Sequence, residues 1–213
     1  MNKPTRKQFT LRPHTVSAAC ASDDRRHAES AQVLLTELEA VCEEVLAQWP
    51  LPHGETLRDA QKDHLALYNL VRRRDRLCDS VSIFSALAVE GFLNYYGVVR
   101  LGEDVFNAHF ERMGLVPKLR ALLLVCDGVD LSPKDPLVAL LQALAADRNR
   151  LAHPKAKEFD GYVPAEERPG VPVPAAGRQA VTRMNDFFAE FLSVVPKAGH
   201  LVPVFESAGR GDR

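Results

Sequence analysis

One short polar stretch, DRNRLAHPK (residues 147–155), holds the residue types best suited to chemistry in this chain. Arg148, Asn149 and His153 follow an apolar run, PLVALLQALAA, that has the pattern of a core helix. Histidine takes or gives a proton near neutral pH. Arginine binds a phosphate bidentately and stabilises the negative charge that builds up on it during reaction. Together these are the groups that cleavage of a phosphodiester needs.

Helical geometry places only part of this stretch on one face. On an ideal helix Asn149 and His153 lie about 40° apart, whereas Arg148 and His153 lie about 140° apart. Pro154 disfavours the α conformation for the residue before it. His153 therefore sits where the helix ends, so its ring can leave the regular face and the long side chain of Arg148 can reach around.

The same cations can also be accounted for by structure alone. Positive charges in the last turn of a helix interact favourably with the helix dipole, by about 0.3–1 kcal/mol, and Arg148, Arg150 and His153 are well placed for this. On residue types alone this structural role is favoured over chemistry. In the functional role Arg150, Lys155 and Lys157 bind the phosphates of an RNA backbone.

Helical patterns cover most of the chain, and no strand pattern or internal repeat interrupts them. They predict an all-α fold, a bundle of five or six helices, with a mobile N-terminal arm at 1–27, a helical domain at 28–196 and a C-terminal tail at 197–213. A Pro-rich loop of unknown role, 154–176, precedes the last helix. Helices are expected at 29–49, 57–99 (one helix, or two with a break near Asp79 and Ser80), 103–112, 116–126, 136–152 and 177–195. Residues expected to face inward are Val33, Leu34, Leu38, Val41, Val45 and Leu46 in the first helix and Phe187, Phe188, Phe191 and Val195 in the last.

Net charge, cysteine and histidine spacing, and the lengths of apolar runs indicate which ligands and which location to expect for this chain. The formal net charge of −1 gives no global basic field, so any contact with nucleic acid must come from a local patch. The four cysteines lack paired spacing and indicate reduced thiols, and the histidines show no metal-ligand spacing, so we expect no metal and no cofactor. With no secretory signal pattern and no uninterrupted apolar run of about 18 residues, the sequence predicts a cytoplasmic protein without membrane contact.

Two motifs resemble those of the HEPN superfamily. Arg148-Asn149-x-x-x-His153 resembles its R-x4-H signature, in which a polar residue commonly follows the arginine. Earlier in the chain, SALAVEGFLNYY resembles the glutamate-bearing central helix of many such proteins. The resemblance covers about residues 30–195, although its specific part is one short motif and one helix.

This resemblance implies a homodimer in which two R-x4-H motifs share a cleft and cleave RNA without a metal ion. His153 would assist attack of the RNA 2′-hydroxyl on the adjacent phosphate, leaving a 2′,3′-cyclic phosphate. Arg148 would hold that phosphate, and Asn149 would orient a catalytic group or the substrate. Many members are toxins or antiphage factors restrained by a separate antitoxin or regulatory protein.

Two alternatives to a ribonuclease stay open. One is a HEPN-like scaffold without catalysis that binds a protein or a nucleotide through the same cleft. The other is a purely structural bundle whose basic helix end only complements the helix dipole. The presence of Arg148, Asn149 and His153 together slightly favours the ribonuclease.

Supporting positions come from the long central helix. Glu90 lies among apolar and small residues, where an unpaired carboxylate would be costly to bury. We expect Glu90, together with Asn94, to face Arg148 and fix its orientation, and an ordinary structural ion pair is the competing interpretation. The basic run RRRDR (72–76) is interpreted as a solvated helix face in preference to an RNA-binding surface.

Overall fold

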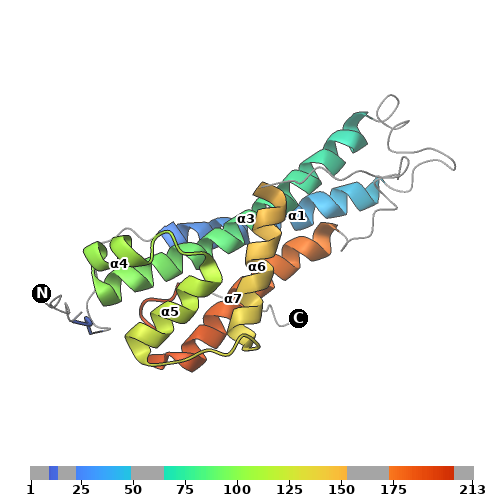
Figure 1. Cartoon of the computed structure of the whole chain (residues 1–213). Coiled ribbons are helices and arrows are strands. Elements are labelled where there is room, and N and C mark those ends of the chain that lie inside the picture. Colours follow the sequence, from blue (N-terminus) through green and yellow to red (C-terminus); the bar gives the residue numbers. More distant parts are fainter. Residues whose placement is uncertain (1–9, 14–22, 49–64, 153–172, 204–213) are drawn as a thin grey trace, which may run out of the picture.

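The chain folds as a bundle of α-helices (Figure 1). The computed structural model describes residues 10–13, 23–48, 65–152 and 173–203, and in these ranges there is no strand. The prediction of an all-α bundle of five or six helices is confirmed. The helices are α1 (Asp23–Ala47), α3 (Leu65–Leu101), α4 (Glu103–His109), α5 (Leu115–Asp127), α6 (Pro136–Ala152) and α7 (Val173–Val194), followed by a short 3-10 helix, Pro196–Ala198.

The 37-residue helix α3 is the centre of the bundle, because α1, α4, α5, α6 and α7 all contact it. The sequence left open a break near Asp79 and Ser80, and the helix is continuous there. Among the described helices only α3 is long and apolar enough to cross a membrane, with 56% of that stretch buried in the bundle. A buried core helix meets the same criterion, so this finding is weak evidence for a membrane location.

Aromatic side chains join α3 to α7 in the core. The ring of Phe92 meets the rings of Phe188 and Phe191 edge to face, with centroids 5.4 and 4.8 Å apart. Such aromatic pairs add to the free energy gained by burying the rings themselves. The four residues of the last helix that were expected to face inward are all buried: Phe187, Phe188, Phe191 and Val195.

Several helix boundaries differ from those predicted. Helix α1 begins at Asp23, inside the segment assigned to the N-terminal arm, and α7 begins at Val173, inside the segment assigned to the Pro-rich loop. Pro174 is compatible with this start because the first turn of a helix needs no amide donor there. Residues 153–172 of the predicted loop, and the first residues of the arm, lie outside the described part of the chain.

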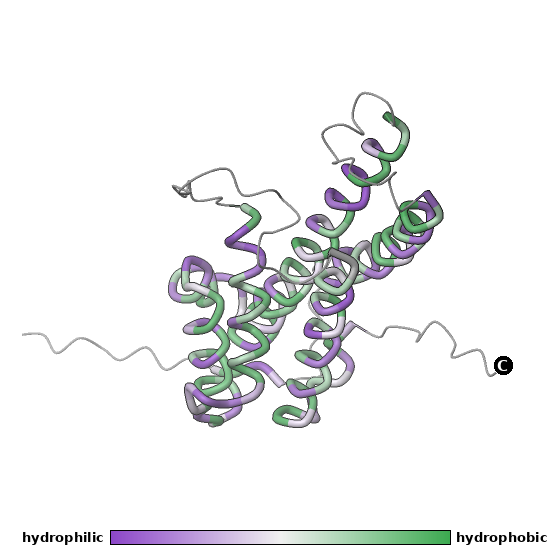
Figure 2. Tube along the Cα trace, turned by 90° about the vertical axis from the view of Figure 1, so that its right-hand side faces the viewer, coloured by the Kyte–Doolittle hydropathy of each residue, from purple (hydrophilic) through white to green (hydrophobic). Residues whose placement is uncertain are grey.

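The predicted inward stripe of α1 is only partly correct. Leu38, Val41 and Val45 are buried, but Val33 and Leu46 are 68% and 70% exposed. A single helix presents a stripe little more than 100° wide to its neighbours, so apolar residues at the edge of that stripe remain at the surface. Figure 2 shows the corresponding alternation of hydrophobic and hydrophilic residues along the helices.

Gly97 allows the short helix α4 to lie close against α3. A Cβ at this position would overlap the ring of Phe106 on α4 and would lie 3.2 Å from Cδ2 of Leu122 on α5. Phe106 is 2% exposed, so its ring has little free space to move into. The absence of a side chain at Gly97 is therefore what permits this packing.

We expect Gly97→Ala to lower the free energy of unfolding by about 1–2 kcal/mol in a urea titration. Alanine gains about 0.5–1 kcal/mol in helix propensity, but overpacking a core costs about 1–3 kcal/mol, so the steric effect outweighs the gain. Gly199→Ala is the control, because its Cβ would meet only Pro196 O at 3.6 Å, an ordinary contact. Equal stability of the Gly97→Ala variant and the wild type would contradict this packing argument.

Candidate functional site

The end of helix α6 carries Arg148 to the middle of α3. Asp135 starts α6 by accepting the Leu137 amide on its Oδ1 at 2.9 Å, and Pro136 occupies the first helical position, where no amide donor is needed. From there α6 runs along α7 and reaches α3 with its C-terminal end (Figure 1). The bounds Pro136–Ala152 are those predicted from the sequence.

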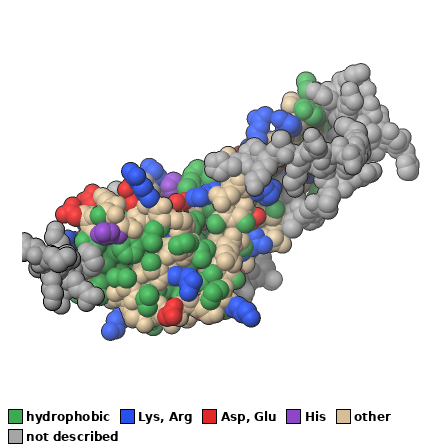
Figure 3. Space-filling model, in the orientation of Figure 1, with side chains coloured by type: hydrophobic (Ala, Val, Ile, Leu, Met, Phe, Trp, Pro, Cys, Tyr) green, Lys and Arg blue, Asp and Glu red, His purple; other side chains and the backbone are tan. Residues whose placement is uncertain are grey.

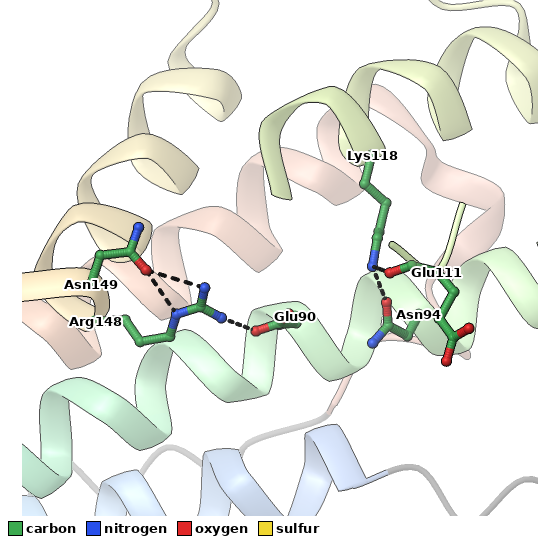
Figure 4. Close-up of polar contacts among 6 residues, drawn as sticks. All are labelled: Glu90, Asn94, Glu111, Lys118, Arg148 and Asn149. Atoms are coloured by element: carbon green, nitrogen blue, oxygen red, sulfur yellow. Dashed lines mark hydrogen bonds and ion pairs between the residues drawn. The ribbon is translucent and has the colours of Figure 1, made fainter. Parts of the chain in front are cut away.

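The guanidinium of Arg148 lies between Glu90 and Asn149 (Figure 4). Its Nη1 donates a hydrogen bond to Glu90 Oε2, so the expected contact between these two residues is present. Its Nη2 and Nε face Asn149 Oδ1 at 3.2 and 3.4 Å. The fork of the arginine is thus held from both sides, by a carboxylate of α3 and by the carboxamide that follows Arg148 in the chain.

Part of the guanidinium is still available to a ligand. Arginine has five N–H donors, and the three contacts with Glu90 and Asn149 use three of them. The other two have no partner among the described residues, and the side chain of Arg148 is 27% exposed. The contact with Glu90 thus leaves part of the hydrogen-bonding capacity of this partly exposed arginine unused.

Three predicted site residues cannot be placed against this geometry. His153, Lys155 and Lys157 lie outside the described residues, as does most of the Pro-rich segment. Their assignment as a catalytic histidine and two RNA-binding lysines stays a prediction from the sequence.

Asn94 does not face Arg148 as expected. Its Oδ1 instead accepts a hydrogen bond from Lys118 Nζ at 2.6 Å. Asn94 lies one turn beyond Glu90, about 6 Å further along α3, and at that level the neighbouring helix is α5, which carries Lys118, and not α6. The supporting role expected for Asn94 is thus corrected to a contact between α3 and α5.

Lys118 is a buried cation that the sequence pattern did not single out. It is 2% exposed, and its Nζ also donates to Glu111 O at 3.1 Å and lies 5.6 Å from the centroid of the Phe106 ring. Burial lowers its pKa, while the negative charges of Glu90 and Glu111 act in the opposite direction. The sequence could have indicated this, because Lys118 lies on the apolar face of LVPKLRALLLVCD and a buried lysine requires a polar partner.

Two further charges at the end of α6 interact with charges on the neighbouring helices. Asp147 accepts a hydrogen bond from Arg183 Nη1 on α7 at 2.7 Å. Arg150, predicted to bind RNA, is exposed and its charge acts on Asp79 of α3, whose pKa burial raises and Arg150 lowers. Successive residues around Arg148 therefore interact with both helices beneath α6. Arg150 remains accessible to a phosphate.

Two of the four arginines in the basic run at 72–76 are paired with neighbouring acids, and the other two, Arg72 and Arg76, are exposed. Arg73 pairs with Glu37 of α1 at 2.5 Å, and Arg74 donates to Asp75 at 2.9 and 3.0 Å. These two partners offset the positive charge of Arg73 and Arg74, and the charge of Arg72 and Arg76 stays in contact with solvent. The geometry is in line with the solvated helix face favoured from the sequence.

The described cysteines are unsuited to nucleophilic chemistry. Cys42, Cys78 and Cys126 are buried, and none of them forms a disulfide with another described cysteine. Burial raises the pKa of the Cys78 and Cys126 thiols to about 11 and also raises the pKa of Cys42. The thiolate is the reactive form, so these side chains act as core residues. Among the described residues no group of three or more His, Cys, Asp and Glu side chains is arranged to hold a metal ion.

A double-mutant cycle can measure the contact between Glu90 and Arg148. Both side chains are more than a quarter exposed, so we expect a coupling of about 0.5–1 kcal/mol in the free energy of unfolding between Glu90→Ala and Arg148→Ala. The control pair is Arg120 and Asp130, which are 3.8 Å apart and 41% and 80% exposed. Its coupling should be close to zero, and equal coupling in both pairs would refute the arrangement described.

Thiol reactivity provides a pH-dependent test of burial. At pH 8 a thiol with a pKa of about 11 is roughly 0.1% ionised, against roughly a quarter for a free cysteine. Cys78 and Cys126 should therefore react with iodoacetamide at least ~200-fold more slowly than a free thiol. Their rates should rise about tenfold per pH unit from pH 8 to 10. Residue-resolved mass spectrometry gives these rates, with urea-unfolded protein as the control, and fast native labelling at either residue would oppose the prediction.

Comparisons of the chain with known proteins identify no relative. No protein-family model matches it, and neither curated proteins nor solved structures give a match. The resemblance to the HEPN superfamily therefore rests on the R-x4-H spacing and the glutamate-bearing helix alone. The contact between Glu90 and Arg148 links those two motifs in space.

Proposed function

We propose that the chain is a HEPN-like, metal-independent endoribonuclease with Arg148 and His153 at its active site. The observation that carries this proposal is the arginine held between Glu90 and Asn149 at the end of α6, with two N–H donors left over. An arginine fixed in this way suits a phosphate that gains negative charge during reaction. A helix-dipole match alone would not require cross-helix positioning of the guanidinium.

The proposed reaction is transesterification of RNA. The 2′-oxygen attacks the adjacent phosphorus, the bond from phosphorus to the 5′-oxygen breaks, and the products are a 2′,3′-cyclic phosphate and a 5′-hydroxyl end. His153 assists by taking the proton of the 2′-hydroxyl, the departing 5′-oxygen takes up a proton from solvent, and Arg148 holds the phosphate. DNA lacks the attacking hydroxyl and is not a substrate.

The active form in this proposal is a homodimer whose two copies of the motif share one cleft. A toxin or antiphage role, with a separate antitoxin or regulatory protein that blocks the cleft, follows from the same resemblance. A strictly monomeric species in light scattering would remove the shared cleft from this model.

The test is cleavage of a mixed RNA pool in excess EDTA. We expect the wild type to produce 2′,3′-cyclic phosphate ends, and we expect His153→Ala and Arg148→Ala each to lower the rate by about 10²–10⁴-fold, the usual effect of losing an acid–base or charge-stabilising group. A substrate with a single 2′-deoxy substitution at the cleavage position should stay intact.

Arg178→Ala is the matched control, because Arg178 also pairs with a glutamate across helices, at 2.8 Å from Glu39, and is not part of the motif. It should cleave like the wild type. If no variant and no wild type cleaves RNA while the protein still binds RNA or nucleotides, the binding scaffold replaces the nuclease. Activity that survives both His153→Ala and Arg148→Ala would exclude this active site.

A further inference from the structure

Away from the site at Arg148, a pocket of about 870 Å³ opens to the surface at the C-terminal end of α5. It is formed by the C-terminal end of α5, by Arg100 of α3, by residues that follow α7 and by the short segment at 10–13. This volume is within the range of pockets that bind small molecules. The lining residues are Leu11, Pro13, Arg100, Leu124, Val125, Cys126, Asp127, Gly128, Lys197 and His200.

The wall contributed by residues 10–13 is held by specific contacts. The amide of Arg12 donates to Arg100 O at 2.9 Å. The side chain of Arg12 lies against Gly102, whose φ of +82° disfavours any residue with a side chain. Leu11 and Pro13, on either side of Arg12, are thereby placed over the pocket. The site is thus built by contacts between distant parts of the chain.

The charges of the pocket favour an anion. Asp127, the one acid among the described lining residues, accepts a hydrogen bond from the Tyr96 hydroxyl and lies 3.6 Å from Arg100 Nη2, so its charge is already balanced. Lys197, which is exposed, then leaves the lining with an excess of positive charge, and the exposed His200 adds a ring nitrogen that can donate a hydrogen bond. The charge of Lys197 would repel a cationic ligand and attract an anionic one.

Arg100 contributes a donor that is not used within the described part of the protein. Its Nη2 donates to Cys126 O, but its Nε has no hydrogen-bond partner among the described residues although Arg100 is only 6% exposed. A buried donor without a partner is unfavourable. Because Arg100 lines the pocket, its guanidinium brings positive charge to the wall against which an anion would lie.

The rest of the lining is apolar and unusually accessible for large aliphatic side chains. Leu124, Val125 and Leu11 are 52%, 42% and 41% exposed, and Figure 3 shows apolar side chains gathered over the α4, α5 and α6 face of the molecule. A ligand that covers these side chains gains from removing them from water. The buried thiol of Cys126 is not a nucleophile, so the site is suited to binding and not to covalent chemistry.

We propose that this pocket binds a free aliphatic monocarboxylate, with the carboxylate toward Arg100 and Lys197 and the chain against Leu124 and Val125. This inference is independent of the ribonuclease. The pocket uses none of the residues at Arg148, so either proposal can fail without the other.

Octanoate is the probe, and isothermal titration of the full chain is the measurement. We expect saturable binding of octanoate, and binding at least about tenfold weaker for octanamide, which has the same chain without the charge, and for acetate, which has the charge without the chain. Lys197→Ala should weaken octanoate binding by about tenfold. Val125→Glu should abolish it, because the new carboxylate repels the ligand at a position exposed enough to leave folding intact.

Lys134→Ala is the control, because Lys134 is an exposed lysine outside the lining and its loss should leave octanoate binding unchanged. Absence of octanoate binding overturns the proposal. So does equal affinity for octanamide, which would indicate an apolar surface without anion recognition. Equal weakening by Lys134→Ala and Lys197→Ala would also overturn it, because the effect would then come from the overall charge.

Discussion

Burial of α3 among all the other described α-helices is the constraint on which the rest of the structure depends. The faces that such a helix buries must be apolar, and a polar side chain buried there must find a hydrogen-bond partner. Three positions on α3 meet this requirement. Glu90 binds Arg148 of α6, Asn94 binds Lys118 of α5, and Tyr96 donates to Asp127 at the end of α5.

These polar contacts do more than satisfy buried groups. Apolar packing alone allows neighbouring helices to slide by small amounts, whereas a hydrogen bond between specific side chains fixes their register. The contacts of Asn94 and Tyr96 fix α5 at two levels along α3, and the contact of Glu90 fixes the end of α6. The candidate site is therefore positioned by a side-chain hydrogen bond between helices, as α5 is, and its residues Glu90, Arg148 and Asn149 lie on helices.

The sequence predicts which segments are helical because most of them have an amphipathic pattern, but it places the starts of α1 and α7 several residues too late. The bounds of α6 follow from Asp135 and Pro136 at its start and Pro154 beyond its end. Glu90 could be linked to Arg148 because a lone carboxylate among apolar residues needs a cation. Asn94 was misplaced for a related reason: spacing along one helix shows which residues share a face, but not which neighbouring helix lies over each turn. The pocket at Arg100 was missed because its lining comes from four separate parts of the chain.

In the proposed function, the pair formed by Glu90 and Arg148 would have two opposing effects on the phosphate of the RNA. The carboxylate offsets part of the positive charge that would attract the phosphate, yet it holds the guanidinium in one orientation, so that less entropy is lost on binding. Arginine suits this position better than lysine because its fixed fork can face Glu90 and Asn149 and still have two N–H groups left over. A lysine ammonium has only three N–H donors on one nitrogen atom. If it bonded to both Glu90 and Asn149, it would have at most one donor left for a ligand. Glu90 therefore offsets only part of the positive charge of Arg148 and still holds its guanidinium in one orientation.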